Sequence, residues 1–239
     1  MQDWENCQKS LGVVFDNQSL LRQALTHSSY VNEHPDAPLP SNERLEFLGD
    51  AVLNFTVAEK LYKEFSDLPE GKLTAIRASL VCRDALVKVA SSLKLGDYLL
   101  LGQGEEASGG RMKPSNLENA MEAVIGAIYL DQGLPKVKRF ILNKLEPRLR
   151  KIKTKGIAPN YKALLQEFTQ EKRKSTPVYQ LLEATGPAHA RRFTVAVTVE
   201  GEVLGEGTGK NKKTAETEAA RSAWEKIEGK EDAHPTPNN

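Results

Sequence analysis

The sequence predicts an all-α domain followed by a small α+β domain with the element order α-β-β-β-α. Apolar residues recur at helical spacing up to about residue 150. From about residue 178 this pattern gives way to short runs rich in Val, Thr and aromatic residues, which are typical of strands. The stretch TKGIAPN between the two patterns predicts a linker. We therefore expect domains at residues 1–152 and 160–229, a linker at 153–159 and a disordered polar tail at 230–239.

Successive helices are expected in the first domain. NQSLLRQALTH begins with Asn17, a residue type that caps helix N-termini, and NERLEFLGDAVLNFTVAEKLYKEF follows as a long helix. PEGKLTAIRASLVCRDALVKVASSLKL predicts two helices that meet near Cys82–Asp84. SNLENAMEAVIGAIYLDQG predicts a helix with Ser115 as its cap and Gly133 as its end, and LPKVKRFILNKLEPRLRKI predicts another. NEHPDAPLPS and LGQGEEASGGR are expected to be loops.

The second domain is expected to begin with the helix NYKALLQEFTQEK. The strands PVYQLLEAT, ARRFTVAVTVE and EVLGEGTG follow, and KKTAETEAARSAWEKIE is a closing helix. Glu200-Gly201 is a short hairpin turn between the last two strands. Because the connections are short, consecutive strands should be antiparallel.

Composition excludes several classes of protein. The polar N-terminus is not a secretory signal, no apolar run approaches the ~18 residues of a membrane span, and two cysteines give no disulfide framework. These observations favour a cytoplasmic protein with no membrane partner. The net charge of +1 does not indicate nucleic-acid binding. However, Lys210, Lys212 and Lys213 lie beside glycines, which favours an anionic partner.

Three acids lie on one face of the helix NERLEFLGDAVL. At about 100° per residue, Glu43, Glu46 and Asp50 share an arc of about 60°. An apolar stripe of Leu45, Leu48 and Val52 lies opposite. Stacked like charges are unfavourable, so a positive group should lie nearby. It could be an arginine or a metal ion, and for this helix alone the arginine is the preferred interpretation. The candidate arginines are Arg44, Arg77 and Arg83.

A second helix favours the metal. In NLENAMEAVIGAIYL, Asn119 and Glu122 share a face with the small residues Ala123 and Gly126, which would let another helix approach closely. Met121, Val124 and Ile128 form the other side. Packed together, the two helices would bring carboxylates and one amide oxygen into one cluster. Oxygen ligands without His or Cys suit Mg²⁺ or Mn²⁺, and such sites perform phosphoryl chemistry.

NERLEFLGDAVL closely resembles the hallmark motif of the ribonuclease III family. The resemblance continues through LTHSSYVNE, PEGKLTAIRASLV, LGQGEEASGGR and NLENAMEAVIGAIYLDQG. The second domain resembles a double-stranded RNA-binding domain in NYKALLQEFTQ, GPAHARRF and GEGTGKNKKTAETEAA. Together these motifs cover nearly the whole chain and match the short bacterial type, which has one catalytic domain and one binding domain.

The resemblance implies Mg²⁺-dependent cleavage of double-stranded RNA, with Mn²⁺ as a substitute, into 5′-phosphate and 3′-hydroxyl ends with short 3′ overhangs. Ribosomal and other RNA precursors are the expected substrates. By position, Asp50 and Glu122 correspond to catalytic acids that also bind the metal. Glu46 and Asn119 occupy further metal-ligand positions, and Glu43 and Glu70 match acids near the metal.

The resemblance also implies partners. The family works as a homodimer through its catalytic domain, with Phe47 as an expected interface contact. RNA contacts are expected from Gln166, Glu167 and Gln170 on the first helix, from His189 in a loop, and from Lys210, Lys212 and Lys213 at the last helix.

Three positions depart from the family pattern. Asn119 stands where Asp is usual, and a neutral amide should hold Mg²⁺ more weakly. Its neighbour Glu118 points about 100° away from it, which makes it a poor substitute. Ala163 removes one RNA hydrogen bond, and Asn211 replaces a usual Ser. Because of Asn119, the alternative function is a catalytically weakened or inactive double-stranded RNA-binding protein.

Overall fold

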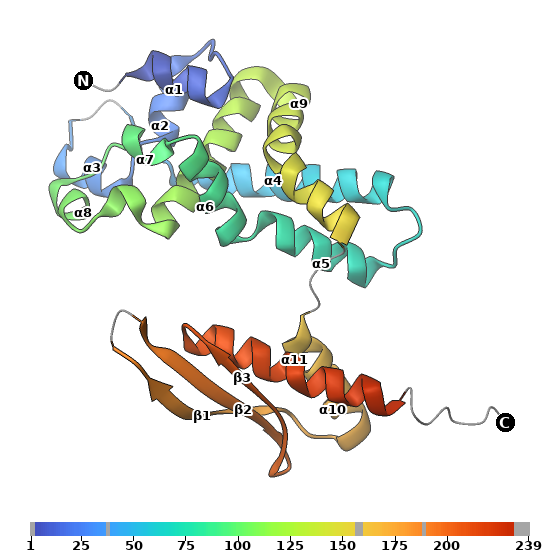
Figure 1. Cartoon of the computed structure of the whole chain (residues 1–239). Helices are drawn as coiled ribbons and strands as arrows, with labels where there is room; N and C mark the ends of the chain where they lie inside the picture. The colour runs from blue at the N-terminus through green and yellow to red at the C-terminus, as the bar shows by residue number, and fades with distance from the viewer. Residues whose placement is uncertain (1–2, 37–38, 156–159, 188–189, 232–239) are drawn as a thin grey trace. The chain divides into compact units, whose positions relative to one another are not determined.

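The structure is a computed structural model that describes residues 3–36, 39–155, 160–187 and 190–231. The chain divides into two compact units, the helical unit (residues 1–157) and the α+β unit (residues 158–239) (Figure 1). Residues 153–155 of the predicted linker belong instead to a helix, and its residues 156–159 lie outside the described residues. The last helix ends at Glu231, and the remainder of the predicted tail is likewise outside them.

Two long helices dominate the helical unit. Its elements are α1 (Trp4–Leu11), α2 (Gln18–Ala24), α3 (Ser28–Glu33), α4 (Glu43–Glu64), α5 (Glu70–Val81), α6 (Arg83–Ser92), α7 (Leu95–Tyr98), α8 (Gln103–Ala107), the 3-10 turn η1 (Gly110–Met112) and α9 (Pro114–Lys155). None of the helices in the described residues has the length and apolar composition that a membrane span requires.

Several local predictions are confirmed and two are wrong. The Asn17 side chain caps α2 by accepting from the Ser19 amide, and Cys82 separates α5 from α6. Ser115 is not a cap, because α9 already begins at Pro114, a residue suited to a first helical turn. The predicted loop LGQGEEASGGR contains α8 and η1, since good helix formers lie between its glycines.

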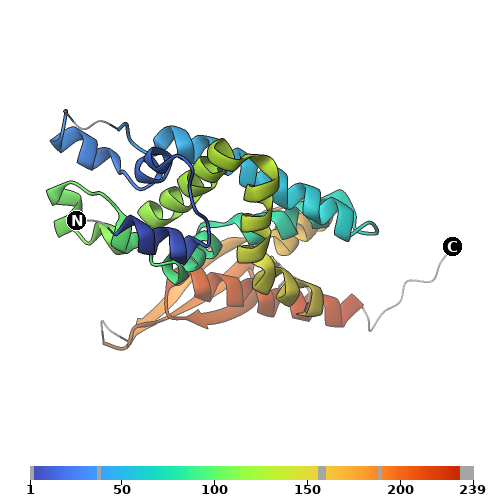
Figure 2. The ribbon, with the colours of Figure 1, turned by 90° about the horizontal axis from the view of Figure 1, so that it is seen from above.

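Helices α4 and α9 pack against each other through the core of the helical unit. Gly133 breaks α9 with φ 75° and ψ 179°, as predicted, and Figures 1 and 2 show the helix changing direction. Of the predicted apolar stripes, Leu45, Val52, Met121, Val124 and Ile128 are buried, and Leu48 packs against them half-buried. Helical periodicity therefore identified the core-facing sides of both helices.

In the α+β unit, helices α10 (Tyr161–Arg173) and α11 (Lys212–Glu231) pack together beside one three-stranded sheet. The antiparallel sheet has the order β1 (Val178–Thr185), β2 (Arg192–Val199), β3 (Glu202–Gly209), with Val195 opposite Gly207. Glu200 and Gly201 both have positive φ, 53° and 84°, as a two-residue hairpin turn requires. The core joins Leu165, Val195 and Val197 to the alanines of α11.

The glycines of β3 let α11 lie directly on the strand. A Cβ at Gly207 would come within 2.1 Å of the Ala219 amide nitrogen, and one at Gly205 within 2.5 Å of the Ala219 carbonyl oxygen. The backbones of α11 and β3 are therefore in close contact, which fixes the position of α11 on the sheet.

Candidate active site and RNA-binding surface

The predicted acids of α4 lie at the edge of the core. Glu46 is half-buried, whereas Glu43 and Asp50 are exposed. The Asn54 side-chain amide donates to Asp50 Oδ1 at 2.7 Å, and the Ser41 hydroxyl donates to Glu43 Oε2 at 2.9 Å. Asn54 was not identified from the sequence as a residue that orients Asp50. Its spacing of one helical turn from Asp50 was the available signal.

The backbones of α4 and α9 touch where these acids meet. A Cβ at Gly49 would lie 1.7 Å from the Glu122 carbonyl oxygen, and a Cβ at Gly126 would lie 2.3 Å from the Leu45 carbonyl oxygen. The prediction that Gly126 allows close helix approach is confirmed, and Gly49 is its counterpart on α4. This crossing places the acids of α4 beside Glu122.

Glu122 carries the most perturbed carboxyl group of the site. Burial raises its pKa to about 8, helped by the negative charges of Asp50, Glu118 and Glu46 and opposed by Arg83. The pKa of Glu46 is also raised, first by burial and then by Glu43, Glu118 and Asp50. Asn119 is half-buried one turn before Glu122. The site thus concentrates negative charge in a partly desolvated place.

The arginine interpretation fails for the acids of α4, because within the described residues none of Arg44, Arg77 and Arg83 forms an ion pair with Glu43, Glu46 or Asp50. The Arg83 guanidinium pairs with Glu118 of α9, not with an acid of α4. Within the described residues, no Lys or Arg forms an ion pair with Glu46, Asp50 or Glu122. Their mutual repulsion is therefore largely uncompensated by protein groups.

The donor chemistry fits a divalent cation. Carboxylate oxygens and one amide oxygen are ligands that Mg²⁺ and Mn²⁺ accept. Burial is the main cause of the two raised pKa values, and a cation would relieve the repulsion between the carboxylates that raises them further. As the side chains stand, no three acidic, His or Cys groups in the described residues converge on one metal position. Like charges without a cation between them are expected to point apart, so binding would require these side chains to turn inward.

The two other predicted residues of the helical unit are Glu70 on α5 and Phe47 on α4. Glu70 begins α5, accepts a hydrogen bond from the Thr74 hydroxyl at 2.9 Å, and lines a hollow with Tyr62 and Arg77. Its charge is not among those acting on Glu46 or Glu122. Phe47 is 81% exposed and borders a hollow of about 620 Å³ with Leu48 and Leu130.

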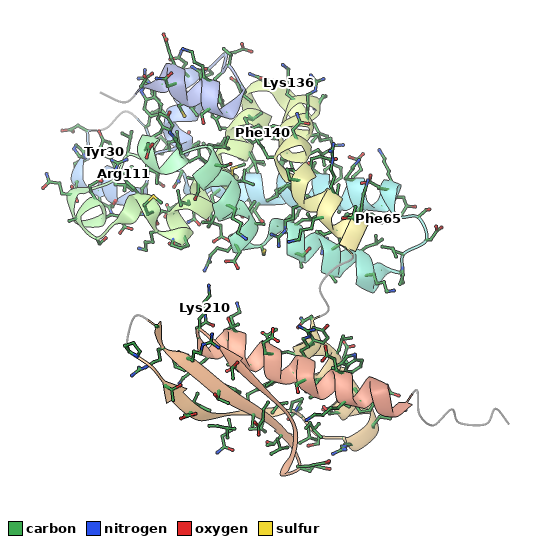
Figure 3. The ribbon with its side chains drawn as sticks, in the orientation of Figure 1. Tyr30, Phe65, Arg111, Lys136, Phe140 and Lys210 are labelled. Atoms are coloured by element: carbon green, nitrogen blue, oxygen red, sulfur yellow. The ribbon has the colours of Figure 1, made fainter. Side chains whose placement is uncertain are left out.

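In the α+β unit, the predicted RNA contacts form two exposed groups. Gln166, Glu167 and Gln170 line one hollow on α10. Lys210, Lys212 and Lys213 are exposed around the start of α11, and Figure 3 shows the Lys210 side chain extending away from the ribbon. His189 lies outside the described residues.

Asn211 has a role that the sequence comparison with the family pattern did not reveal. Its side chain accepts from the Thr214 amide at 2.8 Å and from the Thr214 hydroxyl at 3.0 Å, so it caps α11. The lysines on either side of it are therefore held at a helix N-terminus, where anions are favoured.

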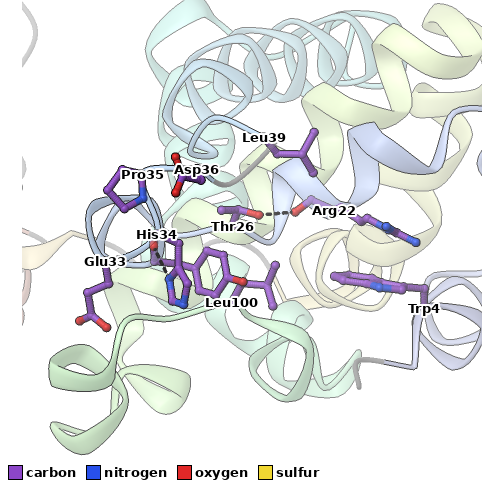
Figure 4. Close-up of a pocket in the computed structure, with 10 residues that line it drawn as sticks. Trp4, Arg22, Thr26, Glu33, His34, Pro35, Asp36, Leu39 and Leu100 are labelled. Atoms are coloured by element: carbon purple, nitrogen blue, oxygen red, sulfur yellow. Dashed lines mark hydrogen bonds between the residues drawn. The ribbon is translucent and has the colours of Figure 1, made fainter.

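Residues of the motif LTHSSYVNE hold α3 against the start of α8. The Ser29 hydroxyl oxygen accepts from the Gly102 amide at 2.9 Å, and Glu33 accepts from the Gln103 amide at 2.8 Å, which ties α3 to the start of α8. His27 caps α3 through its Nδ1 atom. A hollow of about 560 Å³ beside α3, with Trp4, Arg22 and His34 in its wall, contains none of the candidate metal ligands (Figure 4).

Comparison with known proteins gives consistent matches. The family Ribonuclease-III-like matches residues 17–149, and the Double-stranded RNA binding motif matches residues 161–227. A protein named Ribonuclease 3 from Dehalococcoides mccartyi is 47% identical over 228 residues, covering 95% of this chain and 96% of that protein. A protein named Ribonuclease 3 from Geobacillus sp. is 46% identical over 230 residues, which cover 95% of this chain and 93% of that protein.

A solved structure shares the fold of the helical unit. It is the nuclease domain of ribonuclease III from Campylobacter jejuni, described as flexible in a region involved in dimer formation. It is 42% identical with a TM-score of 0.57 and covers 62% of this chain and 99% of that chain.

Proposed function

The chain belongs to the ribonuclease III family and is a double-strand-specific endoribonuclease; we propose that it hydrolyses phosphodiesters with Mg²⁺, or Mn²⁺ in its place. The products would be 5′-phosphate and 3′-hydroxyl ends with short 3′ overhangs. The observation that carries this proposal is the uncompensated negative charge around Glu122, where α4 and α9 cross.

We assign the cation to Glu46, Asp50, Asn119 and Glu122, with Asp50 and Glu122 as the catalytic residues. When bound, a divalent cation lowers the pKa of water and neutralises charge on the phosphate. The chain itself holds these oxygens on two helices locked together at Gly49, and Asn54 fixes the Asp50 side chain. Glu43 and Glu70 would act without binding the cation, through their charge or position.

A cleavage assay tests this function against the alternative of an inactive RNA-binding protein, which Asn119 favours. Long duplex RNA and single-stranded RNA are each incubated with the full chain and Mg²⁺. Short 5′-phosphorylated fragments from the duplex alone are expected. Tight duplex binding without fragments, even at high Mn²⁺, would instead support the alternative.

RNA binding should depend on the three lysines at the start of α11. Changing Lys210, Lys212 and Lys213 to Ala should weaken duplex binding on the order of tenfold or more. The slope of the logarithm of the binding constant against the logarithm of the salt concentration should also become shallower. The expected change is about one unit for each phosphate that a lysine no longer neutralises. Filter binding at several salt concentrations measures both.

The matched control for the lysines replaces three exposed lysines elsewhere, Lys9, Lys88 and Lys172, with Ala. This change removes the same total charge but no proposed contact. Equal weakening in both variants would show that only net charge matters and would remove the assigned RNA surface.

We propose that the enzyme is a homodimer through the surface around Phe47, because this large apolar side chain is exposed beside a hollow and next to Leu130. Phe47→Asp should convert the dimer to a monomer at about 10 µM, as seen by sedimentation, because it would bury a charge without a partner. Tyr62→Asp, at another exposed aromatic residue of α4, is the control. A Phe47→Asp protein that stays dimeric would exclude this surface.

We also propose ribosomal and other RNA precursors as substrates and the cytoplasm, where they are transcribed, as the location. The proposal predicts that cells lacking the protein accumulate uncut ribosomal precursor. Unchanged precursor levels would remove this assignment.

A further inference from the structure

Glu118 is an acidic residue beside the proposed cation site. On α9 it precedes Glu122 by four residues and lies about 40° from it around the helix. Asn119 lies three residues before Glu122 and about 60° away on the other side. The two residues therefore flank Glu122, and the 100° between them does not separate Glu118 from the site.

The Glu118 carboxylate is turned into the structure. Its side chain is only 16% exposed, compared with 62% for its partner Arg83. Arg83 is the first residue of α6, and its Nε donates to Glu118 Oε2, which links α6 to α9. The pair gives Glu118 a counter-ion in the cation-free protein.

The charge of Glu118 reaches both helices of the site. It is one of the negative charges acting on Glu122 of α9 and on Glu46 of α4. Asn119, in contrast, contributes an amide oxygen and no charge. Because the attraction of a divalent cation depends on the summed charge around it, a nearby carboxylate can replace a charge missing at a ligand position.

From this geometry we propose that Glu118 is a further cation-site residue, whose carboxylate supplies the negative charge that Asn119 does not. Arg83 is its counter-ion until a cation is present. This inference rests on the proposed function, since it assigns an additional residue to the same site.

Calorimetric titration of the full chain with MnCl₂, without RNA, tests the proposal. Glu118→Gln keeps the shape of the side chain and removes its charge, so affinity should fall on the order of tenfold. Glu146→Gln is the matched control, because Glu146 lies on the same helix and also pairs with an arginine, Arg150. Its affinity should stay within about twofold of that of the wild type.

Arg83→Gln tests whether cation binding depends on the charge of Glu118 or on its ion pair with Arg83. It breaks the same ion pair but keeps the carboxylate, so Mn²⁺ affinity should be equal to or higher than that of the wild type. A double change, Glu118→Gln with Asn119→Asp, should return the affinity to about the wild-type value. Unfolding temperatures in a chelator show whether each variant is folded.

Two results would overturn the proposal. One is a Glu118→Gln protein that binds Mn²⁺ as well as the Glu146→Gln control does. The other is an Arg83→Gln protein that loses as much affinity as Glu118→Gln, which would show that the ion pair supports the site only structurally. Failure of the proposed function is distinct, since the wild type would then neither bind Mn²⁺ nor cleave duplex RNA.

Discussion

Gly49→Ala should destabilise the helical unit by about 3 kcal/mol and lower its unfolding temperature by roughly 6–12 °C. The added Cβ would lie 1.7 Å from the Glu122 carbonyl oxygen and 2.9 Å from the Gly126 amide nitrogen. Both neighbours are backbone atoms, so relief requires α4 and α9 to move apart. The gain in helix propensity, about 1 kcal/mol, is too small to offset this overlap. Thermal and urea unfolding measure the change.

Gly71→Ala is the control for Gly49→Ala. Gly71 also lies within a helix, α5, but an added Cβ there would meet no atom within 4 Å. That change should stabilise the protein by up to about 1 kcal/mol. If the two variants unfold at the same temperature, the backbones of α4 and α9 are not in close contact at Gly49. Because the displaced carbonyl belongs to Glu122, cleavage by Gly49→Ala should fall as well.

Glu122→Gln should reduce cleavage of duplex RNA on the order of 10³-fold while leaving RNA binding by the α+β unit unchanged. The change replaces a proposed catalytic carboxylate with an amide of the same shape. Single-turnover cleavage and filter binding measure the two properties. A variant that cleaves within tenfold of the wild type would remove Glu122 from the catalytic residues.

The same variant should be more stable than the wild type at alkaline pH in the absence of a cation. In the folded protein the Glu122 pKa lies at about 8, compared with 4.5 for the group without the protein environment. Ionising Glu122 therefore requires more free energy in the folded state than in the unfolded state. As a result, the free energy of unfolding of the wild type decreases between about pH 4.5 and pH 8. Glu122→Gln should therefore have a free energy of unfolding about 1–2 kcal/mol higher than that of the wild type above pH 8. This value is reduced to allow for the partial exposure of the side chain.

Urea unfolding in a chelator at pH 5, 7 and 9 measures this gain. The stability difference between Glu122→Gln and the wild type should widen with pH, because glutamine cannot ionise. A difference that is the same at all three pH values would show that burial does not raise the Glu122 pKa.

Helical periodicity predicted which sides of α4 and α9 face the core. The spacing of Leu45 and Val52 on α4, and of Val124 and Ile128 on α9, identified the buried sides correctly. The turn at Glu200-Gly201 was predictable from the glycine between two strand-like runs, although the positive φ of Glu200 is unusual for a residue of that type. These features depend on local spacing, which a sequence displays directly.

Features that depend on two distant segments were harder to predict. The residues around Gly49 do not indicate that the Glu122 carbonyl lies against it. A glycine within a helix indicates only that some neighbouring group approaches closely. The angle of about 100° between Glu118 and Asn119 argues against Glu118 as a site residue, whereas the angle of about 40° between Glu118 and Glu122 places it beside the site. Its ion pair with Arg83, 35 residues away in sequence, could not be read from one helix.

The close contact between α11 and β3 also affects the thermodynamics of RNA binding. A helix that rests on glycines through its backbone has little freedom to slide or tilt, so Lys212 and Lys213 start from fixed Cα positions. Binding then has to order only their side chains, not a loop, which keeps the conformational entropy lost on association small. A larger residue at Gly207 would push the backbone of α11 away from β3, so it should destabilise the α+β unit and weaken RNA binding without removing any charge.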